Sequence, residues 1–287
     1  MTISPLHLDE LRQAKQRLEH PGIAARLTDA LASPLEVGLA YLPEGAREQI
    51  VSISEVALRA ALRTALATLD GRAKPPSNRL HKAGGALSGA LGGAFGLSAL
   101  AVELPVSTSI MLRSIADVAR SEGEVLAQPD AQMACMEVFA LGGRTEADNA
   151  AESGYFAVRA ALAKAVSDAA RYAATTGVVQ QSAPALVRLV AQIAGRFSIP
   201  VTQKAAAQAV PAVGAAGGAI INVLFLDHFQ DMAHGHFTIR RLERRYGTQV
   251  VEDAYRDLAP AALESPTGSL TESPTDRSDP DRSDGER

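Results

Sequence analysis

Two long stretches without a charged residue constrain the fold of this chain most strongly. Residues 83–102 (AGGALSGALGGAFGLSALAV) and 205–226 (AAAQAVPAVGAAGGAIINVLFL) contain no Asp, Glu, Lys or Arg. Glycines in each stretch recur along one helical stripe, and such small-residue faces let another helix backbone approach closely. We therefore expect two central glycine-faced helices in a glycine zipper, with these residues at the contact: Gly85, Gly89, Gly92, Gly93, Gly96, Gly214 and Gly218.

The composition indicates an all-α protein. The 287 residues include 54 Ala and 23 Gly, with no Trp and only 4% aromatic residues. Ala is the strongest helix former, and no segment alternates as a strand would. The single cysteine, Cys135, excludes a disulfide scaffold and lies in an apolar segment (MACMEVFAL), where we expect a core residue rather than a nucleophile. We predict a single multi-helix bundle around the two Gly/Ala-rich central helices.

The charge distribution divides the chain. Residues 263–287 carry seven acids and three Arg, which accounts for the whole net charge of −4, and they hold almost no large apolar side chain. We therefore predict N-terminal helices over 1–44, a helical domain over 45–259 and a disordered acidic C-terminal tail over 260–287. The pI near 5.9 argues against nucleic-acid binding. Within the helical domain we expect helices to begin at Pro105 and at Pro200.

Two basic segments suggest contact with a membrane. Residues 72–82 hold four Lys or Arg residues and no acid, and residues 240–245 hold four Arg on an expected amphipathic helix. Both could bind the headgroups of anionic lipid, and the arginine segment could equally be a solvated helix end with Glu243 and Glu252 nearby. Two interpretations stay open for the uncharged stretches, as a buried helix pair of a soluble bundle or as a pair that enters a membrane. The predicted lipid- or partner-contact residues besides the glycines are Arg79, Lys82, Arg240 and Arg244.

A polar cluster directly follows the second uncharged stretch. Asp227, His228 and Asp231 put carboxylates and an imidazole close together, a set suited to general acid–base chemistry. Further groups would come from Glu103 or Asp117. The alternative is a helix N-terminus at which Asp227 is the cap. The sequence carries no phosphate-binding loop and no zinc helix, so we predict no cofactor and no metal.

Several separated blocks resemble one family. The segment GGAFGLSALAVELPVSTSIMLRSIADVARSEGE is followed by CMEVFALGG, GYFAVR and PAVGAAGGAIINVLFLDHFQDMAHGHFTIRRLERRYG. Together they resemble the EcsC protein family of bacteria over roughly residues 45–257. The resemblance implies an all-helical, membrane-associated protein without an established activity, and no chemical role is carried onto the matching positions, which are Glu103, Pro105, Arg113, Asp117, Asp227, His228, Asp231, Phe237 and Arg240.

Two functions are expected from the sequence. The first is a cytoplasmic protein, peripheral on the inner membrane, that contacts anionic membrane lipid or a membrane protein such as a transporter. The second is a hydrolase with its polar site after the second glycine-rich helix. The sequence leaves the substrate and the oligomeric state open.

Overall fold

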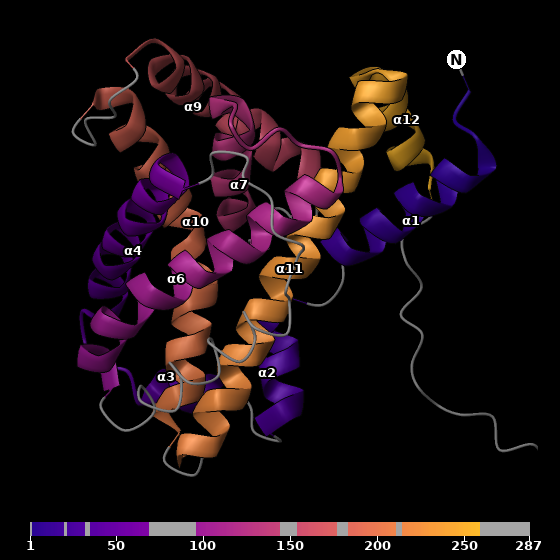
Figure 1. Cartoon of the computed structure of the whole chain (residues 1–287). Helices are drawn as coiled ribbons and strands as arrows, with labels where there is room; N and C mark the ends of the chain where they lie inside the picture. The colour runs from indigo at the N-terminus through magenta and orange to yellow at the C-terminus, as the bar shows by residue number, and fades with distance from the viewer. Residues whose placement is uncertain are drawn as a thin grey trace, which may run out of the picture.

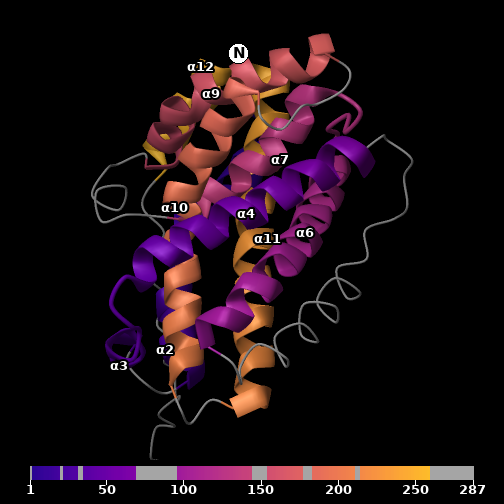
Figure 2. The ribbon, with the colours of Figure 1, turned by 90° about the vertical axis from the view of Figure 1, so that its left-hand side faces the viewer.

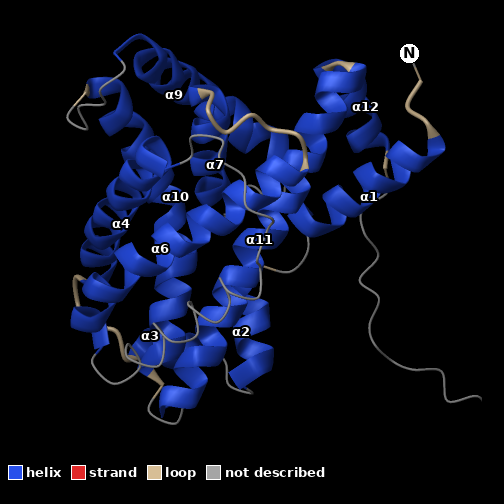
Figure 3. Cartoon of the chain, viewed as in Figure 1, coloured by secondary structure: helices blue, strands red, loops and turns tan. Residues whose placement is uncertain are grey.

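The computed structural model describes residues 2–19, 22–31, 35–68, 96–143, 154–176, 183–210 and 214–258. Within these ranges the chain forms ten α-helices and no strand (Figure 3), which confirms the all-α prediction. The helices are α1 (Pro5–Glu19), α2 (Ile23–Leu31), α3 (Leu35–Ala40), α4 (Ala46–Thr68), α6 (Gly96–Ser121), α7 (Pro129–Leu141), α9 (Gly154–Thr176), α10 (Pro184–Ala209), α11 (Gly214–Tyr246) and α12 (Thr248–Asp257). The predicted tail and most of the first uncharged stretch lie outside the described residues.

Helix α10 lies at the centre of the bundle and α11 runs along its length (Figure 1). Helix α10 contacts α2, α3, α4, α6, α7, α9 and α11. Helices α1 and α12 pack near the C-terminal end of α11, and the first turns of α6 and α11 lie with α3 at the opposite end (Figures 1 and 2). A single hydrophobic core takes residues from α1 through α12. The N-terminal helices therefore share the core of the rest.

Aromatic side chains join the middle of three helices. Phe139 of α7, Phe197 of α10 and Phe229 of α11 are fully buried, with ring centroids 5.2–5.6 Å apart. Phe225 of α11 lies 5.2 Å from Phe229. Edge-to-face and tilted pairs of this kind add about 0.5–1.5 kcal/mol each beyond the burial of their area. A chain with few aromatic residues thus places four of its phenylalanines in one cluster.

Two prolines lie inside helices rather than at their starts, contrary to the prediction. Pro105 lies inside α6, which begins at Gly96, and Pro200 lies inside α10. A proline within a helix removes the bond to the carbonyl four residues earlier. In α6 that carbonyl belongs to Ala101, which is exposed and can be hydrated. The helix therefore continues through Pro105 at reduced cost.

The second uncharged stretch is not one helix. Its first residues end α10 at Ala209, and its last residues begin α11 at Gly214. Pro211, between them, cannot continue α10 without losing a backbone hydrogen bond. Asp227 consequently lies well inside α11, and its interpretation as a helix cap is wrong.

Close backbone approach occurs at glycines outside the two predicted stripes. A Cβ on Gly38 of α3 would overlap the carbonyl of Ala206 in α10. A Cβ on Gly235 of α11 would lie 2.6 Å from Leu18 Cγ and 3.0 Å from the Ala14 carbonyl oxygen in α1. Both distances are too short for a methyl group, so α3 and α1 can pack as they do only because these positions lack side chains.

Candidate functional site

Three helices share a half that is almost free of charge. Residues 96–112 of α6, 198–209 of α10 and 214–226 of α11, here called the uncharged half, contain two ionisable side chains, Glu103 and Lys204. Lys204 Nζ donates to Glu103 Oε1 at 2.5 Å, and both side chains are buried. The Lys204 ammonium also lies 5.0 Å from the Phe225 ring centroid. Burial lowers the pKa of Lys204, and the charge of Glu103 opposes that effect.

Exposed apolar side chains gather at the same end of the molecule. Val102 of α6 is 75% exposed, and Val106 stands one turn later on the same helix at 53%. Ile220, near the start of α11, is half exposed. On and after α3, which packs beside this end of α10, Val37, Leu39 and Tyr41 are also exposed. The uncharged half therefore presents apolar surface as well as lacking charge.

The predicted lipid- or partner-contact residues fall in several places. Gly85, Gly89, Gly92, Gly93, Arg79 and Lys82 lie outside the described residues. Gly96 and Gly214 are the first residues of α6 and α11, and Gly218 is buried. Both α11 arginines bind a carboxylate, because Arg240 donates to Glu124 at 2.8 Å and Arg244 donates to the same group. Their charges are matched within the chain.

The predicted catalytic residues contact different parts of the fold. Asp231 accepts a hydrogen bond from Arg26 of α2 at 2.8 Å, and His228 Nε2 lies 2.9 Å from the Gly142 carbonyl oxygen. Glu103 binds Lys204, as described above, and Asp117 binds Arg120 of its own helix at 2.8 Å. Asp227 is half-buried on α11. No group of three potential metal ligands occurs among the residues for which the structure gives positions.

The other half of α11 is densely charged. Three of its arginines, Arg240, Arg241 and Arg244, here called the arginine cluster, bind the turn that follows α6. Arg241 donates to Glu122 at 2.7 Å and reaches Glu10 of α1 at 3.0 Å. Burial raises the pKa of Glu124, but hydrogen bonds and charge from Arg240 and Arg244 outweigh it and hold the pKa below its ordinary value.

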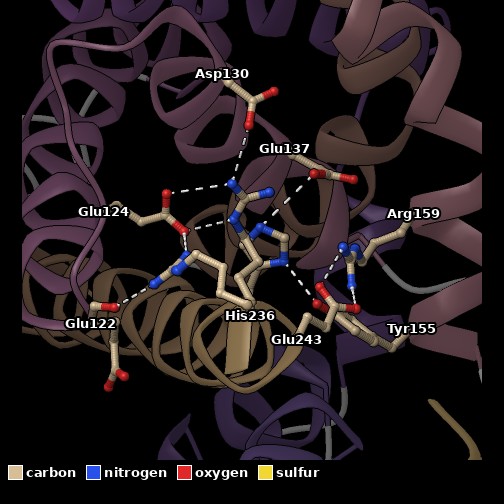
Figure 4. Close-up of polar contacts among 10 residues, drawn as sticks. Glu122, Glu124, Asp130, Glu137, Tyr155, Arg159, His236 and Glu243 are labelled. Carbon is tan, nitrogen blue, oxygen red and sulfur yellow. Dashed lines mark hydrogen bonds and ion pairs between the residues drawn. The ribbon is translucent and has the colours of Figure 1, made fainter. Parts of the chain in front are cut away.

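A second polar group joins α7, α9 and α11 in the core next to this cluster (Figure 4). The Tyr155 hydroxyl lies 3.0 Å from His236 Nδ1, and Glu137 Oε2 lies 3.9 Å from His236 Nε2. Arg159 donates to both oxygens of Glu243 at 2.7 and 3.0 Å, and its guanidinium lies 5.4 Å from the Tyr155 ring centroid. The imidazole is fully buried.

Burial dominates the ionisation of this group. It raises the pKa of Glu137 to about 7, against the charge of Arg159 and Arg240. It lowers the pKa of His236 well below the ordinary value, and both arginines add to that effect. It also raises the pKa of the Tyr155 phenol and, nearby, of the Cys135 thiol. Cys135 is fully buried, which confirms its expected place in the core.

The sequence analysis missed Lys204, Glu137, Tyr155 and the contacts of His236. A signal was present for Glu137, because it is the one charged residue in the segment MACMEVFAL of α7. A single acid between fully buried neighbours indicates an unusual environment. Lys204 directly precedes the second uncharged stretch, but its partner is 101 residues earlier in the sequence, so no local pattern joins them.

Comparison with known proteins gives one match. The sequence model of the EcsC protein family matches residues 6–242. This range includes α1 to α3, beyond the start of the resemblance described above. No curated protein and no solved structure gives a significant match. Among the described residues, no helix combines the length and apolarity needed to cross a membrane.

Proposed function

The chain belongs to the EcsC protein family, and from that premise we propose that it acts at the cytoplasmic face of a membrane, where its uncharged half contacts lipid. The observation that carries the proposal is the exposed apolar surface of Val102 and Val106 on a helix segment whose only charge is a buried, paired Glu103. A surface of this kind gains free energy from contact with acyl chains and loses none to the desolvation of exposed charge.

The apolar contribution is modest by itself. Full burial of a valine side chain is worth about 1.5–3 kcal/mol, and the two valines are already partly covered. Ala101, which is also exposed on this segment of α6, adds little. Apolar contact alone therefore supports reversible rather than permanent attachment.

The basic segment at residues 72–82 supplies the electrostatic part of the proposal. It precedes α6 in the sequence and carries Arg72, Lys74, Arg79 and Lys82 without an acid. Each such base near an anionic surface contributes about 1 kcal/mol, and salt screens the attraction. The arginine cluster is not included in this lipid contact, because Glu122 and Glu124 already match its charges. We assign lipid headgroup contact to Arg79 and Lys82 rather than to Arg240 and Arg244.

Sedimentation with protein-free vesicles tests the proposal. We expect binding to vesicles of phosphatidylcholine with phosphatidylglycerol, weaker binding to phosphatidylcholine alone, and loss of binding at high salt. Val102→Asp/Val106→Asp should abolish binding, because it places two charges on the contacting face. Val187→Asp, a change at an exposed valine near the start of α10, is the matched control and should leave binding unchanged.

The basic segment is tested in the same assay. Arg79→Glu/Lys82→Glu should remove the preference for anionic vesicles, whereas Lys164→Glu/Arg188→Glu, at exposed positions of α9 and α10, should retain it. Equal binding by both Val102→Asp/Val106→Asp and the unmodified chain would overturn the proposal. Binding to native membranes but not to protein-free vesicles would replace lipid by a membrane protein, such as a transporter, as the contact.

The hydrolase interpretation stays a prediction with a separate test. It requires turnover of an ester or amide substrate that is lost in Asp227→Asn and retained in Asp253→Asn, a change at an exposed carboxylate of α12.

A further inference from the structure

The polar group between α7, α9 and α11 contains two titratable side chains that are both buried. The His236 side chain is fully buried and the Glu137 side chain is 6% exposed. His236 Nε2 has no hydrogen-bond partner among the described residues, and Glu137 Oε2 faces it at 3.9 Å. This separation is too long for a hydrogen bond and too short for a water molecule between the two atoms. The two groups therefore face each other directly.

The protonation of such a pair has two forms. One is an ion pair of carboxylate and imidazolium, and the other is a neutral carboxylic acid beside a neutral imidazole. An ion pair buried to this degree needs a close hydrogen bond to offset the loss of hydration. The distance of 3.9 Å does not provide one. A neutral pair avoids the burial of both charges.

The charged groups around the pair also favour its neutral form, because the arginines oppose a positive charge on His236 and the acids oppose a negative charge on Glu137. They come from all three helices and are Asp130 of α7, Arg159 of α9, and Arg240 and Glu243 of α11. Arg159 is bound at both nitrogens by Glu243, and Arg240 is bound by Glu124 and Asp130. Both guanidinium groups oppose a positive charge on His236. Neither is released from its own carboxylate to bind Glu137.

We propose that Glu137 and His236 form a buried proton-binding pair in which the carboxyl group carries the proton and the imidazole is neutral, with the Tyr155 hydroxyl fixing the imidazole. The Glu137 hydroxyl then donates toward His236 Nε2, and a movement of about 1 Å brings the two atoms within hydrogen-bond distance. Because Nε2 is the acceptor, Nδ1 carries the other proton and donates to the Tyr155 oxygen, 3.0 Å away. The three side chains thus hold a defined set of protons.

Loss of the carboxyl proton exchanges the donor and acceptor in both hydrogen bonds of the imidazole. The resulting carboxylate can only accept, so Nε2 must become the donor. The Nδ1 proton is then absent, and the Tyr155 hydroxyl rotates to donate to Nδ1. Burial raises the pKa of Glu137 to about 7, so we place this change near pH 7. The junction of α7, α9 and α11 therefore carries a tautomer switch within the physiological range of pH.

Nitrogen NMR of His236 tests the switch directly. At pH 6 we expect a neutral imidazole protonated at Nδ1, and at pH 8 a neutral imidazole protonated at Nε2. In Glu137→Gln the amide can donate at every pH, so the tautomer should not change. Asp253→Asn changes an exposed carboxylate of α12 and should leave the change in place. An imidazolium signal at pH 6, or one tautomer at both pH values in the unmodified chain, would overturn the proposal.

The pH dependence of unfolding is a second test, and it distinguishes the two partners. Folding moves a proton from His236 to Glu137 between about pH 4.5 and 6.5, since the unfolded imidazole is protonated there and the unfolded carboxyl is not. The two contributions cancel in the unmodified chain. The Glu137 pKa is raised on folding, so its stabilisation is lost as the pH rises. The His236 pKa is lowered, so its stabilisation is lost as the pH falls.

The two single variants should therefore have opposite slopes relative to the unmodified chain. For Glu137→Gln, the folding equilibrium constant should rise about tenfold per pH unit over this window. For His236→Gln it should fall by a similar factor. Slopes equal to that of the unmodified chain in both variants would contradict the proposal. If either variant does not fold, the infrared carbonyl band of a protonated carboxyl, present at pH 6 and weaker at pH 8 in the unmodified chain, decides the same question.

Discussion

Helix α11 contains two halves that use opposite means of packing. Residues 214–226 carry no charge and pack beside a single buried ion pair, Lys204–Glu103. The half from Asp227 to Tyr246 carries the arginine cluster, whose carboxylate partners come from α1, from the turn after α6 and from the start of α7. Beside the first half, Lys204 and Glu103 have only each other as ion-pair partners among the residues of the uncharged half. In the second half, Glu124 is shared by two arginines, so charge is distributed over several contacts. The two halves should therefore differ in how they respond to substitution, salt and pH.

The largest effect should follow loss of one partner of the buried pair. Lys204→Met leaves the Glu103 carboxylate buried without its cation and should lower the free energy of unfolding by about 3–5 kcal/mol. Chemical denaturation measures it. Glu103→Leu/Lys204→Met should recover most of the loss, because no charge is then buried. Lys164→Met, at an exposed lysine of α9, should change the free energy by less than about 0.5 kcal/mol. A loss of that small size in Lys204→Met would show that the pair is not buried as described.

A smaller effect should follow from crowding the uncharged half. Gly38→Ala places a methyl group against the Ala206 carbonyl and should lower the free energy of unfolding by about 1–3 kcal/mol. Gly195→Ala is the control, since α10 has open space at that position. It should raise the free energy by about 0.5–1 kcal/mol through helix propensity. Thermal unfolding of both variants measures the difference. Destabilisation in both variants would mean that the two glycines are needed for their backbone conformation rather than for close packing.

An effect of similar size at neutral pH is expected in the charged half, but this one should depend on pH and salt and become the smallest in acid. Glu124→Gln removes the carboxylate that Arg240 and Arg244 share, at a cost of about 1–3 kcal/mol at neutral pH. The pKa of Glu124 is lowered on folding, so its stabilisation is present above about pH 4.5 and is lost as the pH falls. The variant and the unmodified chain should therefore converge in acid and approach each other in high salt. A constant difference from pH 7 to pH 3 would contradict this account.

The sequence predicts helices better than it predicts their partners. The Ala-rich composition and the absence of strand alternation predict the all-α class, and the described residues form helices and no strand. Pro105 is misleading because the cost of a proline depends on whether solvent reaches the carbonyl that it releases, and solvent reaches Ala101. Exposure of this kind is a property of the folded bundle and leaves no local trace in the sequence.

The candidate sites illustrate the same limit. The family blocks around Glu137, Tyr155 and His236 were recognised separately, yet their meeting depends on the packing of α7, α9 and α11. Asp227, His228 and Asp231 are adjacent in sequence, and the folded helix directs His228 to Gly142 and Asp231 to Arg26. Proximity in sequence therefore predicted a polar group that the fold disperses, and it gave no sign of the group that the fold brings together.

An environment-sensitive fluorophore on Val102→Cys tests the central claim, membrane contact by the uncharged half, most directly. The native Cys135 is fully buried and its thiol pKa is raised, so it should resist labelling and need not be replaced. With anionic vesicles we predict a blue shift and increased emission at position 102, and no change for the same probe on Val187→Cys. A bound protein whose probe at position 102 stays in water, or one whose two probes respond equally, would contradict the account.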